Sequence, residues 1–447
     1  MSDATTWDLV TLSDQLARRA LSALDLLESY HRRIERWDPM LNAFRHIDLE
    51  RAKEQAKTSD ARKHRLGPLD GIPIAVKDNI DIEGLITRSG LGKRGERSAQ
   101  KDAAIVRRLR GAGAVILGHT SMHEGALGAT NDNPHFGRTH NPWRHDFTPG
   151  GSSGGSATAV AASLCPVALG TDTMGSIRLP AAYCGIAGYK PGKGVIDNTG
   201  IEPLYRDLDQ VGPLARSVAD LCLLDAVLTE RQPSAIEIDL SHMRLACLAN
   251  VEQVDLSEDV ELSFAGVLHM LSGAGIEVAE VNLDGWDPAK ARRAGLLLTE
   301  AEAADHYLCD RDLYPSAFSK AFTSLLDYGA NAGSDRLINA EKTIRQIDSV
   351  FDRLFQTADL LLMPTAPQTA FPFDQPAPSN QADLTALANF AGAPAVSLPI
   401  AFNRNGLPIG LQIVGPRGAD RAVLNAAATM ETMVDFHRPD LPRGEPA

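Results

Sequence analysis

The sequence predicts an α/β fold in which helices pack against a central sheet. Segments whose apolar residues recur with helical spacing alternate with short, almost wholly apolar segments that are typical of buried strands. Residues 102–118 are the clearest such unit, because an amphipathic helix ends there at a glycine and a buried strand follows at 114–118. The 447 residues suffice for one large core or for two domains, and neither an internal repeat nor a long linker marks a boundary.

The first half of the chain is expected to begin with helices over about 60 residues. Ser22 precedes an apolar pattern with spacings of three and four residues, where it can act as the N-cap. The elements expected next are a strand and a turn at 69–82, an Ala-rich helix at 156–164, and a strand at 167–170 that delivers residues 172–176.

The second half continues the same alternation. Expected helices lie at 217–228, 260–275, 289–312 and 341–356, and expected strands at 243–248, 277–279 and 360–365. Residues 367–380 contain four prolines and predict a loop, and the proline-rich tail from Arg438 is expected to be frayed.

Composition and charge exclude several classes of function. Hydrophobic residues make up 44% and charged residues 23%, as in ordinary globular proteins. The formal net charge is −13, and since binding to a nucleic-acid backbone needs clustered Lys and Arg, we expect no nucleic acid among the partners. No apolar stretch reaches the ~18–20 residues that span a bilayer, and the N-terminus has no apolar signal segment. We therefore expect a cytoplasmic protein without membrane contact.

The five cysteines are odd in number, widely spaced and contain no C-x-x-C pair. This pattern favours neither a disulfide framework nor a zinc site.

Three short segments carry residues that can do chemistry. Residues 71–79 read GIPIAVKDN, with a lysine after an apolar, strand-like run; residues 150–156 read GGSSGGS; residues 170–180 read GTDTMGSIRLP. Glycine permits tight turns and the close approach of a ligand, and a serine hydroxyl becomes a nucleophile once a base activates it. Each segment alone is also typical of a flexible loop or a solvated strand end, so the functional prediction rests on their combination.

Two other glycine- and serine-based motifs are missing. The glycine-rich segment lacks the G-x-x-x-x-G-K-[ST] pattern of a phosphate-binding loop, which argues against nucleotide binding by that segment. Ser176 does not sit in a G-x-S-x-G elbow, which argues against an α/β-hydrolase.

Together the three segments resemble the amidase signature family, whose members hydrolyse amide bonds with a Ser-Ser-Lys triad. Ser152 and Ser176 are 24 residues apart, which is the family spacing. Residues 102–120 and 388–415 are also similar to the family, and the resemblance is weakest between about 230 and 360.

The resemblance implies one amidase domain over residues 1–447, with a mixed, twisted central β-sheet covered by helices on both faces. Its expected parts are N-terminal helices at 1–62, the signature core with the triad at 63–215, a variable region that shapes the substrate site at 216–360, and C-terminal strands and a helix at 361–437.

By resemblance, Ser176 is the nucleophile, Ser152 is the bridging serine and Lys77 is the general base. A free lysine, with a pKa of about 10.4, cannot accept a proton at neutral pH, so the base role requires burial without a carboxylate partner. The apolar run before Lys77 agrees with burial. Asp78 would keep the amine charged if it reached it, but adjacent side chains of an extended segment point to opposite faces.

The oxyanion hole is expected to consist of the backbone N–H groups of Thr173, Met174, Gly175 and Ser176. Met174 departs from the family pattern, which usually has glycine there. Methionine keeps the N–H, but it would be strained if the turn demanded a positive φ, and its side chain can narrow the acyl pocket.

Three further residues near the serines are expected to support the site. We interpret Asp172 and Arg178 as a buried ion pair that holds the nucleophile turn, and Ser153 as a hydroxyl that hydrogen-bonds within its loop.

By analogy with the family, the segments before and within the serine loop line the substrate site. The residues expected to contact substrate are Glu124, Gly125, Ala126, Thr148, Gly150 and Gly151. The same part of the chain is rich in histidine, at His123, His135, His140 and His145. We interpret these as surface or hydrogen-bonded side chains, because the reaction needs no metal, and we expect neither a metal nor another cofactor.

The sequence therefore predicts an amidohydrolase that cleaves a small carboxamide or related C–N bond through a serine acyl-enzyme, with a small-molecule amide and water as its partners and a homodimer as its possible assembly. One alternative is the glutaminase (A) subunit of a tRNA-dependent amidotransferase, which usually has Gln after the arginine where this chain has Leu179. The other is a catalytically inactive amidase-fold scaffold, which labelling of Ser176 by a fluorophosphonate would exclude.

Overall fold

The computed structural model describes residues 3–95, 98–231, 238–249 and 251–438. Eleven of the strands found there form one sheet: β1 (Phe44–Ile47), β2 (Pro73–Lys77), β3 (Val115–Thr120), β6 (Val167–Asp172), β7 (Ala187–Lys190), β8 (Gln210–Ala215), β9 (Leu245–Leu248), β10 (Val278–Val281), β11 (Leu360–Pro364), β12 (Ala395–Phe402) and β13 (Pro408–Val414). Their order across the sheet is β1-β3-β2-β6-β8-β7-β12-β13-β11-β9-β10, and a small separate hairpin pairs β4 (Asp132–Asn133) with β5 (Gly137–Arg138).

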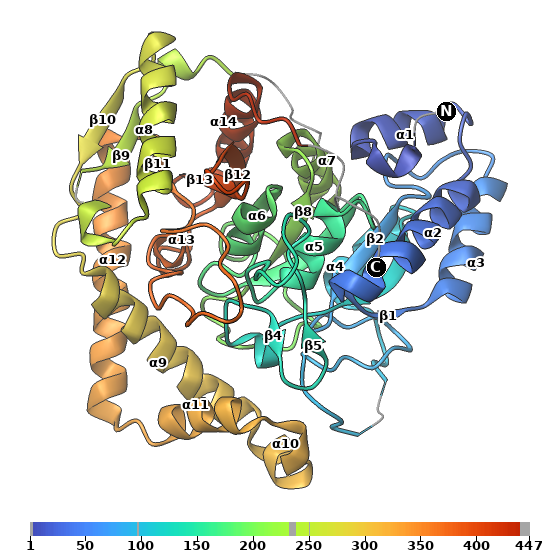
Figure 1. Cartoon of the computed structure of the whole chain (residues 1–447), viewed down its shortest axis with the longest axis horizontal. Coiled ribbons are helices and arrows are strands. Elements are labelled where there is room, and N and C mark those ends of the chain that lie inside the picture. Colours follow the sequence, from blue (N-terminus) through green and yellow to red (C-terminus); the bar gives the residue numbers. More distant parts are fainter. Residues whose placement is uncertain (1–2, 96–97, 232–237, 250, 439–447) are drawn as a thin grey trace.

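Helices flank this sheet (Figure 1). The described α-helices are α1 (Leu9–Ala17), α2 (Ala23–Leu41), α3 (Leu49–Ala61), α4 (Ala104–Gly111), α5 (Gly154–Ala161), α6 (Arg178–Cys184), α7 (Val218–Thr229), α8 (Glu258–Gly273), α9 (Pro288–His306), α10 (Leu308–Leu313), α11 (Lys320–Ala330), α12 (Ser334–Thr357), α13 (Thr385–Phe390) and α14 (Asp420–Met433). Five short 3-10 turns complete the set: η1 (Ala4–Thr6), η2 (Glu124–Ala126), η3 (Leu240–His242), η4 (Val251–Gln253) and η5 (Pro315–Ala317). The predicted α/β class with a mixed central sheet is confirmed.

The pairing of β2 decides where the lysine lies. β2 is parallel to both β3 and β6, with Ile74 opposite Val167 and Val76 opposite Leu169. Every residue of β2 and β6 is buried, as expected for strands in the middle of a covered sheet. Because the carboxyl ends of parallel strands meet at one edge, Lys77 and the residues at the end of β6 are brought together.

The N-terminal region is mostly helical, as expected, and Ser22 does cap α2, since its hydroxyl accepts the Asp25 N–H at 3.0 Å. The expectation of helices alone is wrong at β1, which pairs antiparallel with β3. Asn42 takes a left-handed conformation (φ 51°) that ends α2, and Asp38 accepts the N–H of Ala43 at 2.7 Å. The chain thereby turns onto the sheet edge.

The middle of the chain differs from the sequence prediction in detail. The single helix expected over 289–312 is two helices, α9 and α10, with Tyr307 between them, and α11 had not been predicted. On α11 the buried residues Phe322 and Leu326 are spaced as one helical face. Helices α9 to α12 together form an arm at one side of the molecule (Figure 1).

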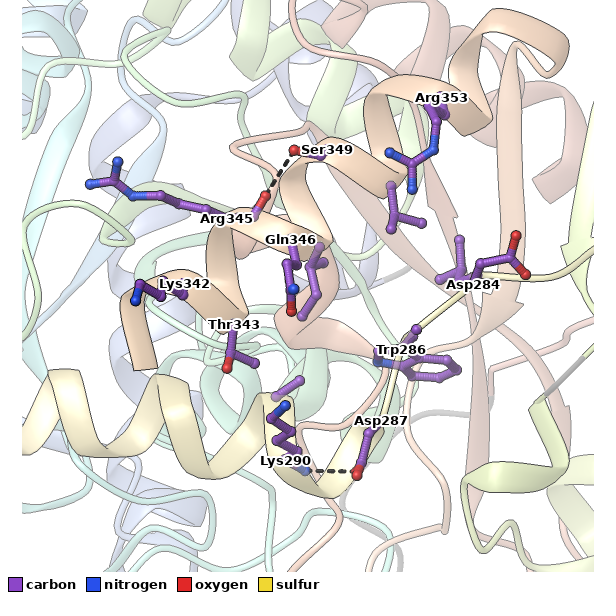
Figure 2. A pocket seen from close by; sticks show the side chains of 15 residues that line it. Asp284, Trp286, Asp287, Lys290, Lys342, Thr343, Arg345, Gln346, Ser349 and Arg353 are labelled. Carbon is purple, nitrogen blue, oxygen red and sulfur yellow. Dashed lines mark hydrogen bonds between the residues drawn. The ribbon is translucent and has the colours of Figure 1, made fainter. Parts of the chain in front are cut away.

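α9 and α12 pack on each other, and with the loop before α9 they enclose the cavity drawn in Figure 2. Among the helices that the structure describes, none combines the length and the apolar character that a bilayer crossing requires.

Candidate active site

Lys77 ends β2 with its side chain completely buried. Its Nζ lies 2.7 Å from Ser152 Oγ and 2.8 Å from Thr171 Oγ1, both within hydrogen-bond distance. Thr171 Oγ1 also accepts a hydrogen bond from the Asn79 side-chain amide at 3.1 Å. The structure therefore brings two of the three predicted catalytic side chains, Lys77 and Ser152, into direct contact.

Burial lowers the pKa of Lys77 to about 7, while the carboxylates of Asp172 and Asp209 act in the opposite direction. The neighbouring Asp78 does not pair with the amine. Its carboxylate accepts the Arg88 N–H at 3.1 Å and lies 3.3 Å from His119 Nδ1. With a pKa of about 7, a substantial fraction of the Lys77 amine is neutral at physiological pH, and the neutral form is the one that a general base needs.

The GGSSGGS segment forms the turn that leads into α5. Ser153 fixes this turn against the nucleophile segment: its hydroxyl donates to the Thr171 carbonyl at 3.1 Å, and its N–H donates to the Ser176 carbonyl at 3.2 Å. At Gly155 any side chain is excluded, because a Cβ would lie 2.3 Å from the Ser121 carbonyl oxygen. The hydroxyl was expected to hydrogen-bond within its own loop, and this detail is wrong: its partner is Thr171 of β6, 18 residues away, so Ser153 ties the loop to the strand that precedes Ser176.

Asp172 and Arg178 form a fully buried ion pair across the nucleophile turn, as predicted. Arg178 Nε donates to Asp172 Oδ2 at 2.9 Å and Nη2 donates to Oδ1 at 2.8 Å. Burial alone would raise the pKa of Asp172, but chiefly the Arg178 charge holds it at about 2. Arg178 also donates to the Thr385 carbonyl at 2.8 Å, to Gln412 Oε1 at 2.5 Å and to Asn389 Oδ1 at 2.5 Å.

The expected oxyanion hole needs one correction. The Gly175 N–H already donates to Asp172 Oδ1 at 2.7 Å, so it is not free to bind an oxyanion. Gly175 instead serves the turn, since its φ is +130° and a Cβ would lie 2.2 Å from Thr385 Oγ1. For the N–H groups of Thr173, Met174 and Ser176 the oxyanion role stays a prediction.

A cavity of about 170 Å³ opens beside Ser176. Its walls are mostly apolar and are made by Ala126, Leu127, Gly128, Ala129, Gly151, Thr173, Met174, Ser176, Leu179, Leu204, Arg292, Leu296, Thr299, Ser379, Gln381 and Ala382. Met174 is 8% exposed and is not among the residues with positive φ, so the strain considered for it does not arise. Met174 is part of the cavity wall, and its narrowing of the pocket stays a prediction.

Of the residues expected to contact substrate, Ala126 and Gly151 line this cavity. Glu124 does not. It is 4% exposed, and its carboxylate accepts hydrogen bonds from the Ser319 N–H at 2.8 Å and the Ser319 hydroxyl at 2.5 Å. The prediction for Glu124 is corrected accordingly: it anchors the start of α11.

Gly125, Thr148 and Gly150 are likewise engaged with the protein. A Cβ at Gly125 would lie 2.2 Å from the Phe322 ring, so that ring covers the glycine. Thr148 donates through its hydroxyl to the Thr130 carbonyl at 2.8 Å and accepts the Gly150 N–H at 2.9 Å. These three residues support the loops around the cavity and are not part of its lining.

Asp209 is a supporting residue that the sequence prediction missed. It is buried, and its carboxylate accepts the Thr173 hydroxyl at 2.5 Å and the N–H groups of Leu204 and Tyr205 at 2.8 and 3.0 Å. Burial raises the pKa of Asp209 to about 6. Asp209 therefore connects Thr173, one of the residues predicted to form the oxyanion hole, to the loop that contains Leu204, which lines the cavity. An aspartate in a charged stretch gives no signal of this role.

Arg292 is another residue that the sequence did not single out. It comes from α9, lines the cavity, and forms an ion pair with Asp383 just before α13. The Arg292 side chain is 13% exposed and that of Asp383 is 5% exposed, so this pair sits at an otherwise apolar wall.

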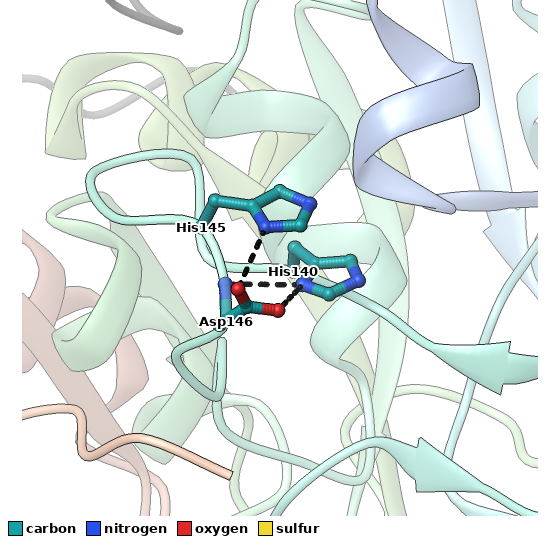
Figure 3. Close-up of side chains that lie close together, drawn as sticks. All are labelled: His140, His145 and Asp146. Atoms are coloured by element: carbon teal, nitrogen blue, oxygen red, sulfur yellow. Dashed lines mark hydrogen bonds and ion pairs between the residues drawn. The ribbon is translucent and has the colours of Figure 1, made fainter.

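The four histidines do not gather at one point. Burial lowers the pKa of His123 to about 4, and His135 Nε2 lies 2.9 Å from Glu124 Oε1. His140 and His145 come together with Asp146, at the cluster shown in Figure 3. Their rings stack at 3.8 Å with only 9° between the planes.

Known proteins are similar to almost the whole chain. A sequence model of the family described as Amidase matches residues 25–424. The A subunit of the glutamyl-tRNA(Gln) amidotransferase of Halothermothrix orenii is 33% identical in an alignment of 467 positions, gaps included. The alignment covers 95% of this chain and 96% of that protein.

Two solved structures have the same overall fold as this chain. A crystal structure described as an amidase is 31% identical, with a TM-score of 0.89 over 96% of this chain and 100% of that one. The structure of the A subunit of the glutamyl-tRNA(Gln) amidotransferase from Thermotoga maritima is 28% identical, with a TM-score of 0.82 over 99% of this chain and 98% of that one.

These similarities overturn one expectation. The exclusion of nucleic acid, drawn from the net charge of −13, is wrong, because proteins similar over nearly the whole chain are named as subunits of a glutamyl-tRNA amidotransferase. Net charge reports on direct contact with a phosphate backbone, and it does not exclude a subunit whose assembly acts on a tRNA.

Proposed function

This chain belongs to the amidase signature family, and from that premise we propose that it cleaves the C–N bond of a carboxamide through an acyl-enzyme on Ser176. The proposal rests mainly on the buried amine of Lys77. This amine forms no ion pair with any described residue, and it lies 2.7 Å from Ser152 Oγ. An amide carbonyl is a poor electrophile, so its cleavage needs an activated nucleophile, stabilisation of the oxyanion and a proton for the leaving nitrogen.

The proton path starts at the neutral Lys77 amine. It takes the Ser152 proton while Ser152 Oγ takes the Ser176 proton, and Ser176 Oγ forms a bond to the carbonyl carbon. The same path then runs backwards and delivers a proton to the nitrogen as the C–N bond breaks. Water repeats the sequence on the acyl-enzyme and releases the acid.

The proton transfer from Ser176 to Ser152 is the step of this path for which the described residues show no hydrogen bond. The Ser153 N–H holds the Ser176 carbonyl at 3.2 Å, so the two serine segments are adjacent. Hydrogen bonds of this kind often tighten only in the substrate complex. Oxyanion charge would be met by the N–H groups of Thr173, Met174 and Ser176.

The cavity indicates what kind of acyl group is taken. A space of about 170 Å³ with mostly apolar walls suits a short, largely apolar acyl group. The Arg292 charge is balanced by Asp383, so the wall presents no net charge to the substrate.

The comparisons favour a second candidate, the ammonia-supplying A subunit of an amidotransferase that acts on glutamyl-tRNA. This candidate is supported by a protein of that name whose sequence is 33% identical in an alignment that covers 95% of this chain. The residue after Arg178 is the observation against it, because Leu179 is buried at the cavity wall where that subunit usually has glutamine. Both candidates share the acyl-enzyme and differ in where the nitrogen goes.

A panel of amides separates the two. We expect the purified chain to release ammonia or amine from short aliphatic or aryl amides without any partner, and to do so faster than from glutamine. Activity confined to glutamine, or dependent on added subunits, would instead identify the amidotransferase subunit. Release that persists unchanged in Ser176→Ala would refute both, because both require the acyl-enzyme.

Met174→Ala is expected to widen the acyl pocket. The variant keeps the backbone N–H, and the freed space should raise kcat/KM for a bulkier acyl group relative to a short one by about tenfold or more. Competition between a long and a short amide measures the ratio.

A matched control separates pocket size from stability. Met363→Ala removes a buried methionine from the same hydrophobic cluster but away from the cavity. Both variants are expected to lose about 2–5 kcal/mol of unfolding free energy, and only Met174→Ala should change the substrate ratio. An equal change in both would contradict the assignment of Met174 to the pocket wall.

A further inference from the structure

A second cavity, of about 580 Å³, lies between α9 and α12 and is separate from the catalytic one. Its walls come from the loop at 283–287, the first turn of α9, and residues 342–353 of α12 (Figure 2). This volume falls within the range of cavities that hold small organic ligands.

Positive charge dominates the walls. Lys290 of α9 and Lys342, Arg345 and Arg353 of α12 all line the cavity. Within the described part of the chain, Lys290, Lys342 and Arg353 form no ion pair, and Arg345 only approaches Glu341 at 3.7 Å. Three unpaired cations around one concavity stand out in a chain whose net charge is −13.

The acidic residues of the cavity offset this charge only in part. Asp287 is the N-cap of α9, and its carboxylate accepts the Lys290 N–H at 2.8 Å. Asp284 stands on the loop beside Trp286 (Figure 2). The lining therefore includes four cationic residues and two acidic ones, and one of the two carboxylates already caps the helix.

Trp286 adds a donor without an acceptor. Its side chain lines the cavity and the residue is 5% exposed, yet the buried Nε1–H has no hydrogen-bond partner in the described structure. Leaving such a buried donor unpaired is unfavourable, because it has lost its hydrogen bond to water without gaining another. An anionic oxygen that reaches the indole would recover that free energy.

From these features we propose that the cavity binds a small ligand with several linked phosphate groups. The number of groups follows from the spacing of the cations. Lys342, Arg345 and Arg353 line the cavity from one helix and span about 16 Å along its axis at 1.5 Å per residue. A single phosphate can meet only one part of this row, whereas linked phosphates, together with the reach of the long Lys and Arg side chains, can meet several of the cations at once. Lys and Arg are the usual side chains for such groups.

Titration of the purified full-length chain with sodium tripolyphosphate tests the proposal. Calorimetry at low salt should show one saturable site, and the Kd should rise with salt because exposed charges are screened. The fluorescence of Trp286 should change on binding, and Trp286→Phe should remove that change and weaken binding. ATP in a parallel titration distinguishes the source of the phosphates: an equal Kd indicates recognition of the phosphate chain alone, and a tighter Kd indicates a nucleotide.

Charge variants give the decisive comparison. Lys342→Gln/Arg353→Gln is expected to raise the Kd at least tenfold, and both positions are on the surface of α12, where glutamine is compatible with the helix. Lys57→Gln, an exposed lysine of α3 on the other side of the molecule, is the matched control and should leave the Kd unchanged (Figure 1). The proposal is overturned if tripolyphosphate shows no saturable binding, if the double variant binds as the parent does, or if only an RNA oligonucleotide binds.

Discussion

Ser176→Ala is expected to lower kcat for amide hydrolysis by at least about 10⁴-fold. The change removes the protein atom that the proposed mechanism bonds to the carbonyl carbon, and loss of a serine nucleophile in comparable triads has effects of this size or larger. The side chain of Ser176 is partly exposed at the cavity, so the variant is expected to fold normally. Initial rates with the best amide of the panel measure the loss.

Ser379→Ala is the matched control for this variant, because Ser379 lines the same cavity from a different segment. Its rate should stay within a few-fold of the parent. A fluorophosphonate should label the parent and Ser379→Ala once per chain and should not label Ser176→Ala. Labelling that survives in Ser176→Ala would place the nucleophile elsewhere.

Lys77→Met is expected to lower kcat/KM by about 10³-fold or more and to abolish its pH dependence. In the parent, a base with a pKa of about 7 must be neutral to act, so log kcat/KM should rise with unit slope below pH 7 and level off above it. Methionine is unbranched, is one atom shorter than lysine, and has no basic group.

Lys190 supplies a control of the same residue type. It is also fully buried, burial lowers its pKa to about 7, and its Nζ donates to the Pro191 carbonyl at 2.7 Å. Lys190→Met should therefore keep the rise of activity with pH even if its absolute rate falls. A flat profile in Lys190→Met, or a preserved rise in Lys77→Met, would contradict the base role of Lys77.

Lys77→Met should also change the stability of the fold in a pH-dependent way. Between pH 7 and about 10.5 the unfolded chain holds a proton on Lys77 that the folded chain does not, so this residue makes stability increase with pH. Below pH 7 the folded state carries the full cost of a buried charge. Lys77→Met should thus have a higher Tm than the parent at pH 6, and the difference should shrink toward pH 10.

Much of the site could be predicted because its residues lie in short sequence segments, where neighbouring residues determine how a side chain is placed. The base role implied by the three segments together required a buried lysine, and the apolar run before Lys77 agreed with burial; the structure finds Lys77 buried at the end of a strand with both neighbours parallel. The alternation of side chains in an extended segment likewise predicted that Asp78 would face away from the amine. The pairing of Asp172 with Arg178 followed from two opposite charges six residues apart on one turn.

The parts that escaped prediction depend on contacts between distant segments. Gly175 was expected to donate to an oxyanion, but the Asp172 carboxylate, folded back by Arg178, takes its N–H. Glu124 was expected at the substrate, but Ser319 binds it from 195 residues away. Sequence spacing carries no information on such long-range partners, and the arm of helices that supplies Arg292 is also where the family resemblance is weakest.

The hydrogen bonds of Arg178 have a consequence for biosynthesis. This guanidinium, next to the nucleophile, is held by Thr385, Asn389 and Gln412, which the ribosome adds more than 200 residues later. A nascent chain can contain both serines and the lysine and still lack the groups that fix the turn around them. The turn around the proposed nucleophile is therefore complete only after α13 and β13 have been synthesised and have packed against it.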